Sequence, residues 1–217
     1  MRTPPGFPPE ITPAFDALRD DMMMLAWKMT LYQNAYLNQD NRALLFERTA
    51  TVFCLFEDSL STDLTISIAR LMDPPVSGKN KPNLTLRYLF ELIREYGNAP
   101  TLLDAVQARY AKLDAILKHI GELRNKVLAH RDRSTALTTP LQLPLTTQNI
   151  IDVCAEFKGI INDIDGYFAE STTLFDFQVS YSNLDNLICH LRRGIQGMNE
   201  DNEREMQRYL PKPSESA

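Results

Sequence analysis

The chain has 217 residues, of which 44% are hydrophobic and 24% are charged, and its formal net charge is −5. This length and composition predict one soluble globular domain with enough apolar residues for a sizeable core. The negative balance excludes a protein coated throughout with cations for nucleic-acid binding, but it leaves room for a local basic patch.

The few glycines and cysteines narrow the class of protein further. Only 8 glycines occur and long stretches lack helix breakers, which favours helices over a β-sandwich with glycine-rich turns. Cys54, Cys154 and Cys189 lie far apart, which argues against a disulfide framework and a cysteine-based zinc site and favours a reduced, cytoplasmic setting. No secretory signal is recognised, and no run of roughly 18 apolar residues predicts a membrane span.

The N-terminal part predicts two long helices after a proline-rich extended segment over residues 1–11. Thr12 is the expected N-cap of the first helix, whose apolar residues recur every three or four positions as far as Tyr36. Asp40 is the expected cap of the second helix, which ends at Asp73 because two prolines follow. A kink is expected at its polar residues 59–63. The expected inward face of the second helix consists of Leu45, Val52, Phe56, Leu60, Leu64, Ile68 and Leu71.

Two further helices are predicted in the middle of the chain. After a loop, Asn83 or Thr85 opens a short helix that Gly97 closes. Pro100 starts the next helix, in which apolar residues recur at three-four spacing through Ile120.

The C-terminal part is expected to begin with a loop over residues 131–146. Thr147 then caps a helix through Phe168, and alternating apolar and polar residues over 174–181 predict a short extended strip that lies on the bundle. A capping-box pattern at Ser182 opens a last helix, and the tail from residue 199 is polar and expected to fray.

These elements together predict an all-α protein, a bundle of about six helices. The helical domain is expected to span residues 12–198, between the extended segment 1–11 and a polar C-terminal tail, 199–217.

The segment Gly121–Arg133, GELRNKVLAHRDR, carries the candidate chemistry. When the spacing of the fourth helix is continued past Ile120, Arg124 falls where an apolar residue is expected. Because a guanidinium buried without a partner costs several kcal/mol, Arg124 needs a carboxylate, a bound phosphate or a wet cleft. Five basic and two acidic side chains over residues 118–133 give a local charge of +3 within this acidic chain.

The spacing of Arg124 and His130 constrains how they act together. Six residues of regular helix leave the two side chains roughly 120° apart. Either the helix loosens before His130, or two copies of the motif face each other across a symmetric dimer. We favour the dimer because it also explains why two arginines, Arg124 and Arg131, follow on the helix face that is apolar as far as Ile120.

A histidine among arginines suits the cleavage of a phosphodiester. Imidazole acts as a general acid or base near neutral pH, and guanidinium groups hold phosphate and stabilise the charge of the transition state. The ribose 2′-hydroxyl of RNA supplies the nucleophile, so the site is expected to need neither metal nor cofactor. The competing interpretation is a salt-bridged end of a helix.

At this point the residues resemble a family. The segment 124–130, RNKVLAH, resembles the Arg-polar-x4-His motif of HEPN domains, helical bundles of prokaryotic toxins and defence systems. Together with ARLMD at 69–73 and LTLR at 84–87, it is similar to the AbiU-type abortive-infection branch. The resemblance covers about residues 20–190 and implies a metal-independent ribonuclease that acts as a homodimer and leaves a 2′,3′-cyclic phosphate.

The resemblance also assigns roles by position. Arg124 and His130 would be catalytic, and Asn125 would be the supporting polar residue. The cations expected to bind substrate are Lys126, Arg131 and Arg133.

Two aspartates are possible supporting residues of this site. Asp132 stands where some HEPN toxins carry a tyrosine whose nucleotidylation silences the toxin, so this mode of control is not expected here. Asp132 is expected to pair with Arg131 rather than to orient His130. Asp73 is expected first to terminate a helix and second to touch the site.

The sequence therefore predicts a cytoplasmic RNA endonuclease of a toxin or phage-defence system, with an antitoxin or another defence protein as a partner class and no membrane association. A second hypothesis is a non-catalytic helical dimer that binds RNA or a protein as an antitoxin or scaffold, in which Arg124 forms a structural ion pair. A third is a ribonuclease held inactive until infection. His119 is expected to be a surface or packing residue, and Trp27 to belong to the core or the dimer surface. Cys189 and His190 are expected to pack.

Overall fold

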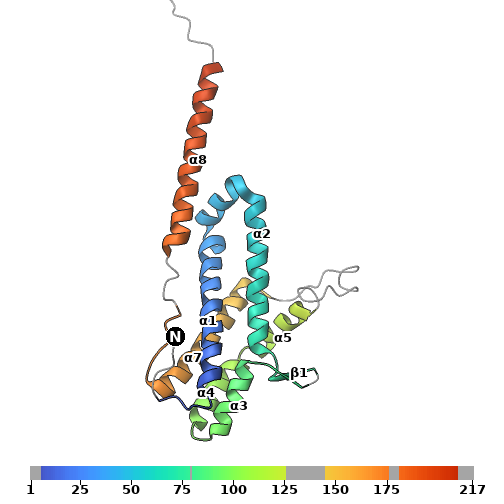
Figure 1. The fold of residues 1–217 in the computed structure, drawn as a ribbon. Coiled ribbons are helices and arrows are strands. Elements are labelled where there is room, and N and C mark those ends of the chain that lie inside the picture. The colour runs from blue at the N-terminus through green and yellow to red at the C-terminus, as the bar shows by residue number, and fades with distance from the viewer. Residues whose placement is uncertain (1–5, 79, 126–144, 176–180, 210–217) are drawn as a thin grey trace, which may run out of the picture. The chain divides into compact units, whose positions relative to one another are not determined.

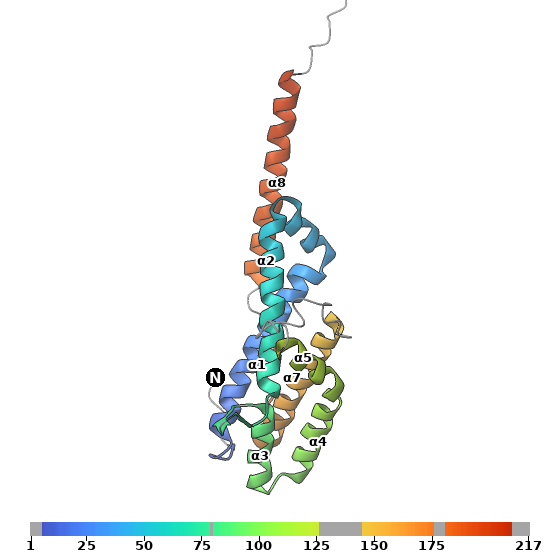
Figure 2. The same cartoon turned by 90° about the vertical axis from the view of Figure 1, so that its right-hand side faces the viewer.

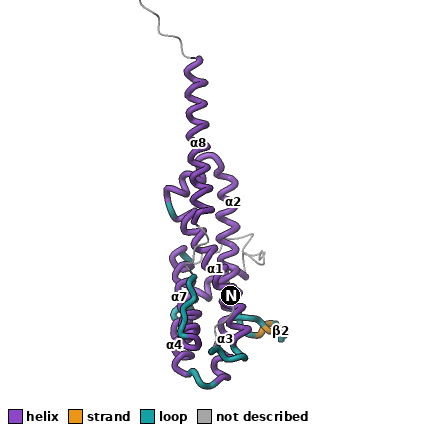
Figure 3. Tube along the Cα trace, turned by 60° about the vertical axis from the view of Figure 1, so that its left-hand side comes forward, coloured by secondary structure: helices purple, strands orange, loops and turns teal. Residues whose placement is uncertain are grey.

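The computed structural model describes residues 6–78, 80–125, 145–175 and 181–209 (Figure 1). Helices make up most of this described part, and its only strands are β1 (Val76–Ser77) and β2 (Lys81–Pro82), two residues each (Figure 3). The strands pair antiparallel in the turn after the second helix. The predicted all-α class is confirmed.

The chain divides into two compact units. The first combines residues 1–30 with 58–177, and the second combines residues 31–57 with 178–217. The helices α1 (Thr12–Tyr32) and α2 (Gln39–Met72) each contribute to both units. The candidate functional residues that the structure describes, Asp73, Arg124 and Asn125, belong to the first unit.

The core of the first unit is built from one face of each of its helices. These are α1, the second part of α2, α3 (Leu86–Tyr96), α4 (Pro100–Ala111), α5 (Asp114–Leu123) and α7 (Thr147–Ala169). The largest fully buried side chains of this core are Ile11, Phe15, Leu18, Met22, Leu25, Ile68, Leu86, Leu89, Ile93, Ile120 and Phe157. The apolar three-four spacing therefore identified the buried faces of α1, α3 and α7.

The helices α4 and α7 lie side by side (Figure 2). Their apolar contact includes the rings of Tyr110 and Phe157, stacked with centroids 6.3 Å apart. At the edge of this contact, Arg109 donates hydrogen bonds to Asp163 at 2.6 Å and to Glu156 at 3.1 Å, and both carboxylates raise the pKa of its guanidinium. This packing holds α4, from which α5 and Arg124 follow.

The ends of α2 and α3 confirm the local predictions. The helix α2 ends at Met72, immediately before Asp73 and its two prolines. Thr85 caps α3 by accepting a hydrogen bond from the backbone N–H of Tyr88, and Gly97 closes it with a left-handed φ of 76°.

Three predicted helix starts are wrong by one or two residues. Thr12 is already helical rather than the cap of α1. The start of α2 is capped by Asn38, which accepts the N–H of Asn41, rather than by Asp40. Thr146 rather than Thr147 caps α7, because Thr146 has the extended backbone and accepts the N–H of Asn149. Neighbouring residues of similar capping ability differ only in backbone conformation, which sequence does not reveal.

The predicted continuous helix after Pro100 is also wrong. It breaks at Lys112 and Leu113, between α4 and α5. Leu113 nevertheless keeps a near-helical backbone (φ −96°, ψ −7°) and donates its N–H to the carbonyl of Tyr110. Because this tight turn nearly preserves the helical phase, Leu113, Leu117 and Ile120 are buried as predicted.

In the second unit, the first part of α2 departs from the predicted inward face. Val52 and Phe56 are 48% and 57% exposed, whereas Leu45 is buried. The helix bends at Thr49 (φ −131°, ψ 30°), not at residues 59–63, and the Thr49 hydroxyl donates to the Leu45 carbonyl. Such a bond to the preceding turn bends helices.

The second unit also contains a π-helical turn over Gln33–Leu37 and the helix α8 (Tyr181–Tyr209). Arg42 and Glu57 form an ion pair within α2, and Arg48 donates to Asn199 of α8 at 2.9 Å. The prediction that the chain frays from residue 199 is wrong as far as Tyr209, because α8 continues to that residue.

Most of the extended strip predicted over residues 174–181 is not described, whereas the capping box predicted at Ser182 is contradicted. Residues 176–180 lie outside the described part, Phe175 is buried, and Tyr181 already begins α8. Ser182 is therefore helical and is not an N-cap.

Candidate functional site

Arg124 lies directly after α5 and keeps helical backbone angles (φ −55°, ψ −52°). Its Nη1 donates to Oδ1 of Asp73 at 2.6 Å, and its Nε donates to Oδ1 of Asn125 at 3.0 Å. The side chain of Arg124 is 24% exposed and that of Asp73 is 28% exposed. The partner that a half-buried guanidinium requires is therefore a carboxylate that solvent still reaches.

Asp73 both ends α2 and contacts the candidate site, so the structure combines its two expected roles. The loop after it is held by Asn83, whose side chain donates to the carbonyl of Pro74 and whose N–H donates to that of Pro75. These bonds restrain the backbone on the C-terminal side of Asp73.

Tyr110, to which Arg87 is hydrogen-bonded, holds the C-terminal end of α2. The hydroxyl of Tyr110 donates to the carbonyl oxygen of Met72 at 3.4 Å and accepts from Nε of Arg87 at 3.2 Å. Burial raises the pKa of Tyr110, and the hydrogen bond from Arg87 partly offsets this rise. Two side chains from α3 and α4 thus position Asp73, the residue that binds Arg124.

Sequence reasoning assigned neither Tyr110 nor Arg87 a role at the site. Tyr110 belongs to the apolar spacing of α4, which conceals its polar hydroxyl, and Arg87 occurs only within the LTLR segment of the family resemblance. A buried tyrosine usually has a partner for its hydroxyl, and this is the one signal that pointed to such a contact.

The other residues predicted for the site are outside the described part. They are Lys126, His130, Arg131, Asp132 and Arg133. Of the predicted set, the structure therefore brings together Arg124, Asn125 and Asp73. The convergence of Arg124 with His130, the pairing of Asp132 and the symmetric dimer stay predictions.

The remaining candidate residues differ in burial. His119 is half-buried, and its Nδ1 is buried without a hydrogen-bond partner among the described residues. Cys189 and His190 are exposed on α8, so their predicted packing role is wrong. Trp27 is 37% exposed, and Cys154 is buried, which raises the pKa of its thiol to about 12.

No three His, Cys, Asp or Glu side chains in the described ranges are grouped so that they could hold a metal ion. Within the same ranges, every helix is too short or too polar to cross a membrane.

The fold and the site define a helical protein that presents an arginine at the end of a core helix, ahead of an appropriately spaced histidine in the sequence. A family model for the AbiU2 HEPN domain matches residues 9–186, and the chain belongs to this family. No curated protein and no solved structure matches the chain. The abortive-infection family predicted from the sequence is thus confirmed.

Proposed function

We propose that the chain is a metal-independent RNA endonuclease of a phage-defence or toxin system, with Arg124 and His130 as catalytic residues. The observation that supports this most is the placement of Arg124. The resemblance makes it the arginine of the HEPN motif; it lies within the matched residues, directly after α5, and its side chain is 24% exposed. Asn125 supports the guanidinium through its side-chain oxygen.

The proposed reaction needs only groups of the chain and of the substrate. The imidazole of His130 takes the proton of the ribose 2′-hydroxyl, and the 2′-oxygen attacks the adjacent phosphorus. The bond from phosphorus to the 5′-oxygen breaks, and that oxygen accepts a proton from a second, protonated imidazole. The products are a 2′,3′-cyclic phosphate and a 5′-hydroxyl, and Arg124 stabilises the charge on the phosphoryl oxygens.

The second imidazole is proposed to be that of His130 in a partner copy. Six residues of helix separate Arg124 from His130 by roughly 120°, so a composite site across a two-fold axis brings these groups together more readily than one helix. Lys126, Arg131 and Arg133 would then bind the RNA backbone on both sides of the scissile bond.

Asp73 has a specific place in this proposal. In the free protein, the carboxylate of Asp73 accepts a hydrogen bond from the guanidinium of Arg124. In the proposal, this guanidinium binds the substrate phosphate. Substrate phosphate would replace Asp73 as the partner of Arg124, since a guanidinium binds either anion through the same fork of N–H groups. Loss of the carboxylate in Asp73→Asn should therefore lower the KM for RNA.

The test is RNA cleavage by the purified full chain in excess EDTA. Cleavage should yield 2′,3′-cyclic phosphate ends, and His130→Ala and Arg124→Lys should each reduce the rate at least about 100-fold. The matched control is His190→Ala, which removes an exposed histidine of α8 and should leave the rate unchanged. Full activity of the His130→Ala variant would overturn the proposed mechanism.

A second candidate function is a non-catalytic helical dimer that binds RNA or a protein partner as an antitoxin or scaffold. The close contact of Arg124 with Asp73 favours it, because this is the structural ion pair that the hypothesis requires. In that case the wild-type chain cleaves no RNA in EDTA, while Arg124→Ala dissociates the dimer. A catalytic role instead predicts lost cleavage with the dimer retained.

A further inference from the structure

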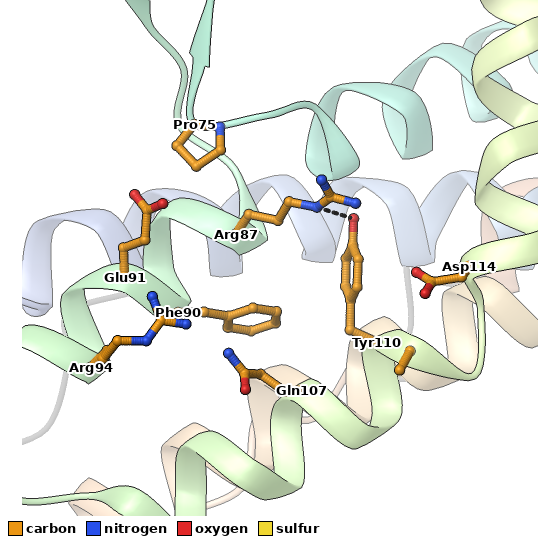
Figure 4. Close-up of a pocket in the computed structure, with 9 residues that line it drawn as sticks. Pro75, Arg87, Phe90, Glu91, Arg94, Gln107, Tyr110 and Asp114 are labelled. Carbon is orange, nitrogen blue, oxygen red and sulfur yellow. Dashed lines mark hydrogen bonds between the residues drawn. The ribbon is translucent and has the colours of Figure 1, made fainter.

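A pocket of about 390 Å³ lies between α3 and α4 in the first unit (Figure 4). The rings of Phe90 and Tyr110 pack edge to face with centroids 5.7 Å apart and supply the aromatic part of its lining. Both rings are buried, whereas four charged side chains at the rim are exposed: Arg87, Glu91, Arg94 and Asp114. A pocket of this size accommodates one nucleotide-sized ligand.

The charged groups of the rim have hydrogen-bonding capacity that no described residue uses. None of the four forms an ion pair within the part of the chain that the structure describes. Arg87 uses Nε for the hydroxyl of Tyr110 and lies over its ring at 5.4 Å, and its two Nη groups have no hydrogen-bond partner among the described residues. Figure 4 shows this bond.

The balance of two guanidinium groups and two carboxylates bears on the kind of ligand. Glu91 and Asp114 would oppose the attraction of Arg87 and Arg94 for a phosphate, so the rim has no net charge that favours an anion. A ligand that matches this rim must present hydrogen-bond acceptors and donors on a flat, largely apolar body. The purine base guanine has these properties, because O6 and N7 accept from an arginine fork while N1 and the 2-amino group donate to a carboxylate.

We propose that this pocket binds one guanine base, with an arginine at O6 and N7, a carboxylate at N1 and the 2-amino group, and the ring of Phe90 against the base. The base can belong to a free nucleotide or to single-stranded RNA, since both present the same edges.

The position of the pocket links it to the Arg124 site. Tyr110 lines the pocket and donates to the carbonyl of Met72, next to Asp73, which binds Arg124. Pro75, two residues after Asp73, is also part of the lining. If the chain is the endonuclease proposed above, the pocket selects RNA with guanine near the cleaved bond. That extension depends on the proposed function, whereas guanine binding does not.

The first experiment is calorimetric titration of the full chain with GMP, IMP, AMP and inorganic phosphate. GMP should bind, IMP should bind about tenfold more weakly because it lacks the 2-amino group, and AMP and phosphate should bind more weakly still. Arg94→Gln and the double variant Glu91→Gln/Asp114→Asn should each weaken GMP binding at least about tenfold. Arg192→Gln, which neutralises an exposed arginine of α8, is the matched control and should have no effect.

The second experiment distinguishes RNA from a free nucleotide. It compares the binding of two 2′-O-methyl oligouridines, one with a single guanine and one without. Neither oligomer can be cleaved by attack of a 2′-hydroxyl, because that hydroxyl is methylated. Stronger binding of the guanine-containing oligomer to the wild type, but not to Arg94→Gln, would support an RNA base. GMP binding without this preference would assign the pocket to a free nucleotide. Equal binding of GMP and AMP, no GMP binding, or wild-type affinity in both pocket variants would overturn the proposal, whatever the cleavage assay shows.

Discussion

The ion pair between Asp73 and Arg124 should stabilise the first unit measurably. Two unit charges about 4 Å apart attract by about 4 kcal/mol at an effective dielectric constant of about 20. Both side chains are about one-quarter exposed, so solvent and the loss of side-chain entropy cancel part of this attraction. We expect a net coupling free energy of about 1–2 kcal/mol.

A double-mutant cycle measures this coupling. The wild type, Asp73→Asn, Arg124→Gln and the double variant are unfolded in urea, and the fluorescence of Trp27 reports on the unit that contains the pair. Each single change should lower the free energy of unfolding, and the double variant should lose less than the sum of the two. Additivity within about 0.5 kcal/mol would refute the inference that this contact stabilises the fold.

Lys28 and Asp63 provide a matched control in the same unit. Their ion pair has the same N–O distance, 2.6 Å, but the carboxylate is 50% exposed. The corresponding cycle should give a coupling below about 1 kcal/mol, because exposed pairs are worth little in water. Equal coupling for the two pairs would show that burial does not decide the strength of the Asp73 contact.

Further predictions concern the cysteines and the start of α7. In the native protein, a thiol reagent should modify Cys54 and Cys189, which are exposed, and leave Cys154 unmodified until unfolding. Because burial raises the pKa of Cys154 from 9.0 to about 12, the stability it contributes is complete below about pH 9 and is lost as the pH rises towards 12. Between about pH 9 and 11, the free energy of unfolding of Cys154→Ala, measured in urea, should therefore fall less than that of the wild type. Thr146→Ala should lower the free energy of unfolding by about 1 kcal/mol and Thr147→Ala by much less, and the reverse order would contradict the observed cap.

Much of the fold was predictable because local chemistry determines it. The two prolines after Asp73 end α2 wherever the helix packs, since the residue before a proline avoids the helical region. Thr85 and Gly97 delimit α3 for equally local reasons, a side-chain cap and a left-handed residue. Regular apolar spacing identified the buried faces of the helices in the first unit.

Other features depended on contacts that spacing does not encode. Val52 and Phe56 share a face with Leu45, but a periodic pattern shows which residues lie together and not whether another element covers them. The polar α8 likewise continues to Tyr209, where its composition predicted fraying.

At the candidate site, the sequence by itself determined that Arg124 interrupts an apolar face and so requires a partner. Only the tertiary structure decided that the partner is Asp73, which is 51 positions away, and that Tyr110 and Arg87 hold the end of the helix before it. The requirement follows from the cost of burying one charge, a property of the residue itself. The identity of the partner depends on how α2, α3, α4 and α5 pack, and that arrangement is a property of the whole core.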